Sequence, residues 1–184
     1  MRIFWFFLAL SGFSIPVVFF AFLYESDVFE ERTIEINRRR ADCFEFLSNL
    51  ENQREINYFQ INIPQIGFEA TPKSATWSHQ AKEFNSQIKV LAEWTNIVKS
   101  ERLDFRIRVD MGFAGFRAIP LSGSCAFEKT AIARTRVNCY IKGKLTYVQK
   151  FYLPQFISDD NTADPFTDTL TNLKLHLERN SRGL

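Results

Sequence analysis

The sequence predicts an α+β domain in which an antiparallel sheet packs against a long C-terminal helix, preceded by one apolar N-terminal segment. Three observations lead to this prediction. The chain opens on a long uncharged stretch, several later segments alternate apolar and polar residues, and the C-terminal segment repeats leucine at helical spacing. At 184 residues, the chain is long enough for one domain with a substantial core and short for two.

The composition indicates a globular protein with an unusually aromatic interior. Hydrophobic residues make up 46% of the chain, charged residues 24%, and 20 residues are phenylalanine. These side chains therefore either fill a large apolar volume inside the protein or line one. The net charge of +2 is too small to indicate nucleic-acid binding, which needs a clustered basic face. The single basic run, Arg38 to Arg40, is interpreted as a solvated turn, with a lipid headgroup contact as the alternative.

Cysteine and histidine usage gives no sign of a metal site. Cys43, Cys125 and Cys139 are an odd number and contain no CxxC spacing, so neither a zinc site nor a disulfide framework is indicated. The only histidines are His79 and His176. We expect no metal and no cofactor.

The stretch from Ile3 to Tyr24 contains no charged residue and is long enough to cross a hydrocarbon layer of ~30 Å. It predicts a single-pass transmembrane anchor within residues 1–25. A cleaved signal peptide is the alternative, although the apolar run is longer than usual and ends without a small-x-small site. Arg2 precedes the run and acidic residues follow it, so the positive-inside rule favours an extracytoplasmic domain.

The first strand is expected from Arg32, where Ile34 and Ile36 share one face. An amphipathic helix follows from about Ala41, and residues 49–57 form a second short helix or a turn. Pro64, Gly67 and Pro72 restrict the next segment to short strands. Half-buried antiparallel strands are then predicted at 76–82, 87–99, 102–109, 121–128 and 134–142.

The last two strands should form a hairpin with a turn centred on Ile132. That register places Cys125 opposite Cys139, close enough for a cross-strand disulfide. Two buried thiols are the alternative, and we favour the thiols.

The C-terminal helix has the clearest start signal in the chain. Asp164 offers an N-cap and Pro165 occupies the first helical position. The apolar residues that follow at helical spacing are Phe166, Leu170, Leu173 and Leu177.

This order of elements resembles the START-like superfamily, which includes polyketide cyclases, Bet v 1-type allergens and lipid transfer domains. Ile34 and Ile36 match the family's first strand, and Cys43 and Phe44 match its valine-aromatic pair. Further matches are Phe46, Leu47, the run Asn49 to Asn52, the run Ala133 to Val137, and the run Thr169 to Lys174.

The resemblance spans Glu31 to Asn180 and implies a helix-grip fold, with a cavity between a curved sheet and the C-terminal helix. A domain of residues 31–180 is therefore expected. Two features depart from the family pattern: Arg39 and Arg40 replace the usual prolines, and no tryptophan follows Asn52. A subset of the family carries an apolar segment before the first strand, as this chain does.

Seven residues are predicted to line such a cavity, or to fill a core in its place. They lie on strands or on the C-terminal helix: Trp77, His79, Trp94, Phe105, Phe127, Phe166 and Leu170. Ligand pockets are mostly apolar with a few polar groups, which this set fits. Tyr140 also lies on a strand, but its face is not determined.

His79 is the candidate for acid-base chemistry, since its position in the alternation points it inward. The alternative is a histidine with a purely structural role. Met111 to Phe116 form a glycine-containing loop that serves as a lid, dips into the bilayer, or simply connects two strands.

Three functions remain open. The first is a membrane-tethered protein that binds a hydrophobic small molecule or lipid. The second is an enzyme of the cyclase or dehydratase kind that uses His79 or a buried carboxylate such as Glu93. The third is an interaction protein whose interior is filled by phenylalanine. Cavity volume separates the third from the first two, and a convergent pair of titratable groups would favour the second.

Overall fold

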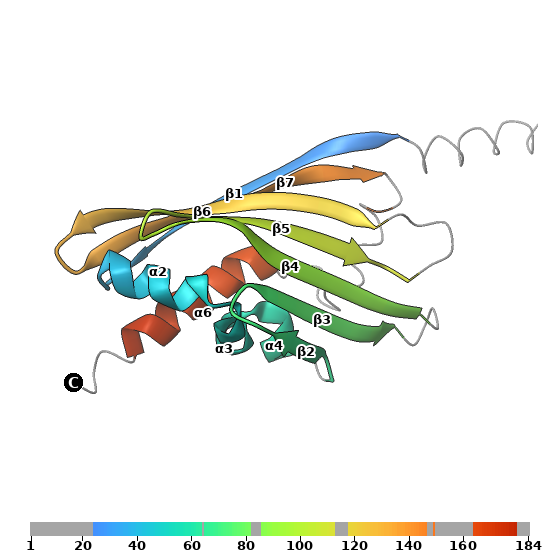
Figure 1. Cartoon of the computed structure of the whole chain (residues 1–184), viewed down its shortest axis with the longest axis horizontal. Coiled ribbons are helices and arrows are strands. Elements are labelled where there is room, and N and C mark those ends of the chain that lie inside the picture. The colour runs from blue at the N-terminus through green and yellow to red at the C-terminus, as the bar shows by residue number, and fades with distance from the viewer. Residues whose placement is uncertain are drawn as a thin grey trace, which may run out of the picture.

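The computed structural model describes residues 24–63, 65–81, 86–112, 118–146, 149 and 164–179. They form one seven-stranded antiparallel sheet covered on its inner face by helices (Figure 1). The strands are β1 (Glu25–Ile36), β2 (Gly67–Ala70), β3 (Ser74–Ala81), β4 (Ser86–Val98), β5 (Arg102–Asp110), β6 (Ile119–Ala131) and β7 (Arg134–Thr146). The helices are α2 (Arg40–Ser48), η1 (Leu50–Asn52), α3 (Gln53–Ile56), α4 (Tyr58–Asn62) and α6 (Pro165–Arg179).

The strand order is β1-β7-β6-β5-β4-β3-β2, so the first two strands form the two edges. Helix α6 runs beneath the sheet, with α2 near one end and α3 and α4 near β2 and β3 (Figure 1). This is the α+β helix-grip architecture expected from the sequence. The predicted strands are present, and so are the helix from about Ala41, the short helical segment within residues 49–57 and the C-terminal helix, with ends that differ by a few residues.

Strand β1 is the largest departure from the predicted boundaries. It begins at Glu25 rather than Arg32 and pairs with β7 along its whole length, from Glu25 opposite Thr146 to Ile36 opposite Thr135. Acidic residues interrupt the alternation of this first half, so the sequence pattern resembles a linker. The pairing with β7 makes it a strand, because β7 supplies backbone partners whatever the side chains are.

The predicted transmembrane segment lies outside the described residues, except for Tyr24. Within the part of the chain that the structure describes, every helix is too short or too polar to cross a bilayer.

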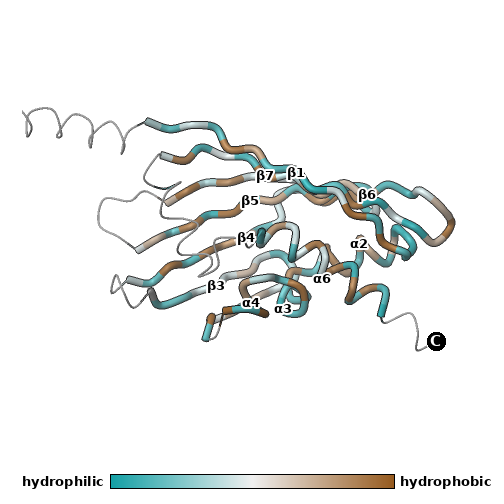
Figure 2. The backbone as a smooth tube through the Cα atoms, turned by 180° about the vertical axis from the view of Figure 1, so that it is seen from behind, coloured by the Kyte–Doolittle hydropathy of each residue, from teal (hydrophilic) through white to brown (hydrophobic). Residues whose placement is uncertain are grey.

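Hydrophilic and hydrophobic residues alternate along the strands (Figure 2). Such alternation places apolar side chains on one face of a sheet and polar side chains on the other. The largest core cluster fills the space between β1, β5, β6, β7, α2 and α6. Among its fully buried members are Ile36, Leu103, Val137 and Leu173. The second half of α6 belongs to this core through Leu173 and Leu177, which fixes the helix under the sheet.

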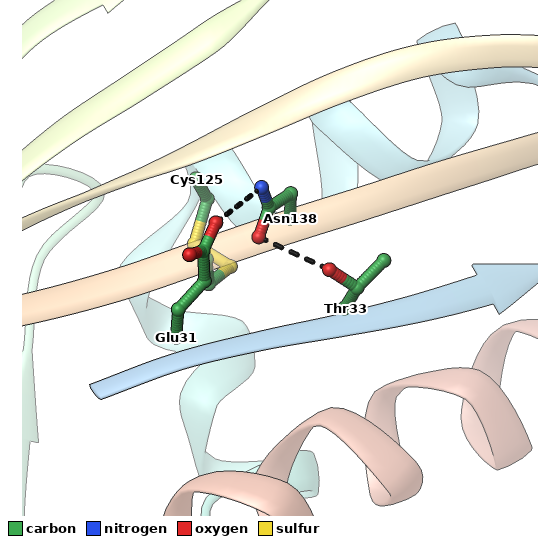
Figure 3. The surroundings of a disulfide bond; sticks show 5 residues. Glu31, Thr33, Cys125 and Asn138 are labelled. Atoms are coloured by element: carbon green, nitrogen blue, oxygen red, sulfur yellow. Dashed lines mark hydrogen bonds between the residues drawn. A yellow bond between two sulfur atoms is a disulfide. The ribbon is translucent and has the colours of Figure 1, made fainter.

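Cys125 and Cys139 form a disulfide, which corrects the expectation of two buried thiols (Figure 3). They lie opposite each other on β6 and β7, in the predicted register, with Cα atoms 4.1 Å apart. This is the short spacing of a non-hydrogen-bonded pair. Alternation in the sequence shows that both cysteine side chains face inward. The same alternation is expected for two free thiols and for a disulfide, so the sequence pattern could not distinguish them. On the outer face, Asn138 bonds to Glu31 and Thr33 of β1.

Reducing the Cys125–Cys139 bond should lower the free energy of unfolding by about 2–4 kcal/mol, because the unfolded chain regains the freedom of the closed loop. Urea unfolding of the detergent-solubilised chain, with and without reductant, measures the change. A Cys125→Ala, Cys139→Ala double variant should not respond to reductant. The disulfide would be disproved if the denatured, unreduced protein titrated as having three free thiols instead of the single thiol of Cys43.

Candidate functional site

A cavity of about 330 Å³ lies between the inner face of the sheet and the helices. Its sheet side is formed by inward-facing residues of β3 to β7, including Val90, Ile107 and Ile141. Its helix side is formed by α2, η1, α3, the α4 region and the first two turns of α6. The wall is almost entirely apolar, and its polar side chains are Gln53, Asn57, His79, Glu93 and Thr169.

Helix α6 therefore contributes to two different environments. Its first two turns place Pro165, Phe166, Thr169 and Leu170 in the cavity wall. Its later turns place Leu173 and Leu177 in the tightly packed core. The same apolar stripe runs along both halves, so the difference comes from what lies opposite it.

Six of the seven residues predicted to line a cavity do lie in its wall: Trp77, His79, Trp94, Phe105, Phe166 and Leu170. Phe127 does not. It is 3% exposed in the core and packs edge-on against Phe44, with ring centroids 5.5 Å apart. Both Phe105 and Phe127 face inward from neighbouring strands, but α2 covers the end of the sheet where Phe127 lies.

A glycine on β6 makes room for one of these aromatic residues. Gly123 lies opposite Phe105 of β5. A Cβ atom at this position would overlap the Phe105 ring and the Tyr140 carbonyl group. The missing side chain therefore lets the Phe105 ring lie over β6, where it forms part of the cavity wall.

Sequence reasoning missed much of the wall. Alternation alone would have identified Ile88, Val90, Ile107, Val109, Leu121 and Ile141, since all share the inner face with residues that were chosen. The helix-side residues Leu47, Leu50, Phe59, Ile63 and Ile66 carry no such signal. Met111 of the glycine-containing loop is 2% exposed and also lines the cavity, whereas residues 113–117 lie outside the described part of the chain.

Glu93 does not fit the proposed catalytic role. The enzyme hypothesis offered a buried carboxylate such as Glu93 as an alternative to His79, but Glu93 is exposed. It alternates with the inward-facing Ala92 and Trp94, and lies opposite Arg106 on the outward side of β5. Among the described residues of the cavity wall, His79 therefore has no buried carboxylate beside it. Within the described residues there is also no cluster of three side chains suited to hold a metal ion.

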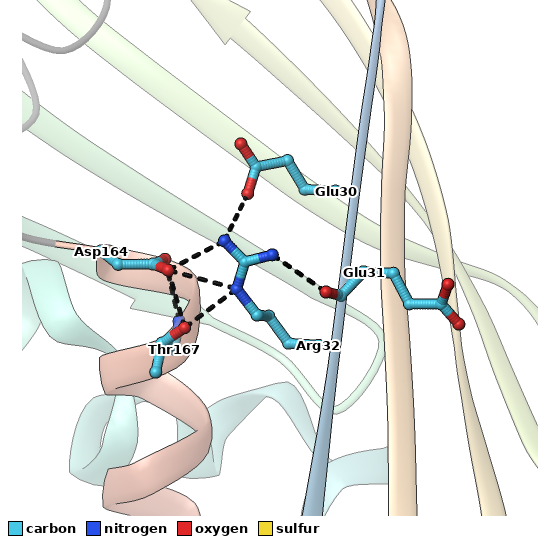
Figure 4. A network of polar contacts seen from close by, with 5 residues as sticks. All are labelled: Glu30, Glu31, Arg32, Asp164 and Thr167. Carbon is cyan, nitrogen blue, oxygen red and sulfur yellow. Dashed lines mark hydrogen bonds and ion pairs between the residues drawn. The ribbon is translucent and has the colours of Figure 1, made fainter.

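The first turn of α6 is fixed to β1 by a network centred on Arg32 (Figure 4). The Arg32 guanidinium donates to Asp164 Oδ2 at 2.9 Å, to Thr167 Oγ1 at 3.0 Å and to Glu30 Oε2 at 2.9 Å. As predicted, Asp164 is the N-cap, because its Oδ1 accepts the Thr167 backbone N–H at 3.1 Å. This network positions Pro165 and Phe166 in the cavity wall.

Ionisation of Asp164 strengthens this network. Partial burial raises the pKa of its carboxyl group, but hydrogen bonds from Thr167 and Arg32 outweigh burial, and the pKa is lowered overall. The hydrogen bonds and charge of Asp164 also raise the pKa of Arg32. By contrast, burial raises the pKa of the free Cys43 thiol to about 11, so this thiol is not a nucleophile near neutral pH.

The arginines after β1 are far from the point where the N-terminal segment joins the domain. The 12 residues of β1 extend about 40 Å, and Arg38 to Arg40 follow the far end of the strand. The Arg38 Nε donates to the Leu177 carbonyl oxygen at 2.6 Å, and Arg39 pairs with Asp42 at 3.1 Å. The structure does not test whether these arginines contact a lipid headgroup, so that alternative stays a prediction.

Tyr140, whose orientation the sequence did not determine, faces outward. Its ring stacks on Phe29 of β1, with ring centroids 5.9 Å apart, and Lys142 Nζ lies 5.8 Å from its centroid. It takes no part in the cavity wall.

Comparisons with known proteins show the fold and no more than the fold. No protein-family model and no curated protein matches the sequence. A solved structure of an uncharacterised protein from Rhizobium leguminosarum is 17% identical, with a TM-score of 0.54, 85% of this chain covered and 99% of the other. Norcoclaurine synthase from Thalictrum flavum, solved with dopamine and hydroxybenzaldehyde, is 6% identical, with a TM-score of 0.58 and coverages of 86% and 91%.

A third similar structure is DynU16, a protein of the dynemicin biosynthetic locus. It is 10% identical, with a TM-score of 0.51, and the match covers 82% of this chain and 47% of DynU16. These likenesses confirm the helix-grip fold that the sequence resemblance implied. They do not test the resemblance to a membrane-anchored subset, and at such identities a shared fold does not define a function.

Replacing the helix cap with Asp164→Ala should cost about 1 kcal/mol and lower the melting temperature by about 2–4 °C at pH 7. Because the folded-state pKa of Asp164 is lowered, this stabilisation is present above its unfolded pKa of about 3.9 and is lost as the pH falls through the folded value. Thermal unfolding from pH 7 to pH 2 should therefore show that the melting temperatures of the wild-type protein and of Asp164→Ala converge in acid. An Asp164→Asn control keeps a capping oxygen and should lose less stability. A difference in melting temperature between the wild type and Asp164→Ala that stays constant down to pH 2 would contradict this explanation.

Proposed function

We propose that this chain is a membrane-tethered binding protein that holds a hydrophobic small molecule or lipid in the cavity between the sheet and α6. The observation that carries the proposal is the cavity itself, about 330 Å³ with an almost entirely apolar wall. This volume lies within the range of ~300–1,000 Å³ typical of ligand pockets. It argues against an interaction protein whose interior is completely filled.

Binding without covalent chemistry is favoured over a cyclase or dehydratase. General acid-base catalysis on an apolar substrate needs converging titratable groups, and the cavity wall offers His79 but no buried carboxylate among its described residues. The similar norcoclaurine synthase structure is a complex with dopamine and hydroxybenzaldehyde, so that protein binds small aromatic compounds.

Two further features support the proposed membrane tether and the side of the membrane on which the domain lies. The uncharged stretch from Ile3 to Tyr24 leads directly into β1 at Glu25. The Cys125–Cys139 disulfide favours an oxidising compartment, since such bonds rarely persist in the cytosol. We therefore propose a single-pass anchor with the domain on the extracytoplasmic side.

The ligand proposal is tested by native mass spectrometry of the detergent-purified full chain. We expect a copurified apolar ligand, and a Val90→Phe variant should lose at least about nine-tenths of it, because the added ring occupies the cavity at a cost of about 1–3 kcal/mol in stability. The matched control is Leu91→Phe, which makes the same kind of change on the outer face of the same strand. A wild-type chain with no bound ligand from several hosts, or equal loss in both variants, would overturn the proposal.

The tether is tested separately by extracting host membranes with alkaline carbonate. The full chain should stay in the membrane pellet, and added protease should digest its domain from the extracytoplasmic side. Release of the intact chain into the supernatant would contradict a transmembrane anchor, and protection from protease would contradict its orientation.

A further inference from the structure

His79 brings an unused hydrogen-bonding group into an apolar environment. It lies on the inner face of β3 opposite Ile88 of β4, and it forms part of the cavity wall. Its Nδ1 atom is buried and has no hydrogen-bond partner among the described residues. Buried polar groups are normally hydrogen-bonded, so an exception inside a cavity wall calls for an explanation.

The two nitrogens of this imidazole are in different environments. Nδ1 is sealed from solvent, whereas Nε2 is not among the sealed atoms of the described residues, and the side chain as a whole is only partly buried. A neutral imidazole carries its proton on one nitrogen only. Because a buried unpaired N–H is rarer than an unpaired acceptor, the proton belongs on Nε2. The imidazole then presents an N–H donor on its open side.

The side-chain oxygens of two other polar residues of the wall, Asn57 and Thr169, already have partners. Asn57 Oδ1 accepts the Phe59 backbone N–H at 3.0 Å. Thr169 Oγ1 donates to the Pro165 carbonyl oxygen at 2.7 Å and accepts the Tyr58 backbone N–H at 3.1 Å.

The indole Nε1 atoms of Trp77 and Trp94 have no partner among the described residues, but both are sealed from solvent. A ligand would have to move a ring to reach either of them. His79 is thus better placed than these groups to donate to a ligand.

The scarcity of charged side chains in the described part of the cavity wall limits the charge that a bound ligand is able to carry. Glu93 is the single charged side chain among the described residues of the wall, and it is exposed. An ionised ligand group in this cavity would lose its hydration without gaining a countercharge, which costs several kcal/mol. An uncharged acceptor avoids that cost, because one hydrogen bond satisfies it.

We propose that His79 determines the specificity of the cavity by donating a hydrogen bond from Nε2 to an oxygen acceptor, such as a ketone or ester carbonyl group, on an uncharged and otherwise apolar ligand. This inference rests on the proposed function, because it needs a ligand in the cavity. It assigns His79 a role in recognition and requires no proton transfer.

The experiment compares two probes of nearly the same shape, 2-acetylnaphthalene and 2-isopropenylnaphthalene, which differ in a carbonyl oxygen and a methylene group. Affinities of both are measured by calorimetry or fluorescence on the detergent-solubilised full chain. The ratio of ketone affinity to alkene affinity should fall by about 3- to 10-fold in His79→Phe, which keeps an aromatic ring and removes the donor. A His79→Gln variant, whose amide is still able to donate, should recover part of the ratio.

Gln80→Phe is the matched control, because Gln80 follows His79 on the exposed outer face of β3 and is not part of the cavity wall. This variant should leave the ratio unchanged. Circular dichroism and thermal unfolding check that each variant is folded, and binding of the alkene probe checks that the cavity is intact.

The outcomes separate the two proposals. If both probes bind and His79→Phe leaves the ratio unchanged, the role of His79 is overturned and the cavity remains a binding site. If the ratio falls equally in Gln80→Phe, the change does not arise in the cavity and the role of His79 is again overturned. If neither probe binds the wild-type chain and no ligand copurifies with it, the proposed function fails, and this inference fails with it.

Discussion

A helix of 15 residues is about 22 Å long, whereas the 13-residue strands β6 and β7 extend over about 43 Å. Helix α6 is therefore too short to cover the inner face of the sheet by itself. Its second half completes a tightly packed core with α2 at one end. Toward the other end, the first half of α6 and the shorter helices leave the cavity open. The division between core and cavity follows from this difference in length.

The position of α6 depends on polar contacts with β1 at both ends of the helix. Arg32 holds the first turn through Asp164 and Thr167. At the last turn, the Asn37 backbone N–H donates to Glu178 Oε1 at 2.8 Å, and Arg38 donates to the Leu177 carbonyl oxygen. Arg32 lies on the inner face of β1, and Asn37 and Arg38 directly follow this strand. These contacts set the distance between helix and sheet, and hence the shape of the cavity.

The chemistry of the wall favours recognition over catalysis. Almost every lining side chain is apolar, and Glu93, which would have completed a catalytic pair with His79, is exposed. One imidazole in an apolar wall is well suited to orient a ligand that carries one acceptor, because a hydrogen bond is costly to lose where water does not replace it. The disulfide between Cys125 and Cys139 also lines the cavity, so β6 and β7, two neighbouring strands of its sheet side, are covalently joined.

Most of the fold could be predicted from the sequence, because periodicity and capping are local. Alternation located the strands from β3 to β7, and Asp164 with Pro165 marked the start of α6. The register that pairs Cys125 with Cys139 also followed from counting residues around Ile132. The first half of β1 could not be found in this way, because its strand conformation depends on pairing with β7.

The site could be predicted only in part. The sequence determined that Phe105 and Phe127 face the same side of the sheet, but only the tertiary structure decided that Phe105 lines a cavity and Phe127 fills the core. That choice depends on which helix lies opposite each residue, and no local pattern contains this information. The same holds for the cysteine pair and for the open side of His79. The sequence by itself determined which side chains face inward, and packing between distant segments decided what they meet there.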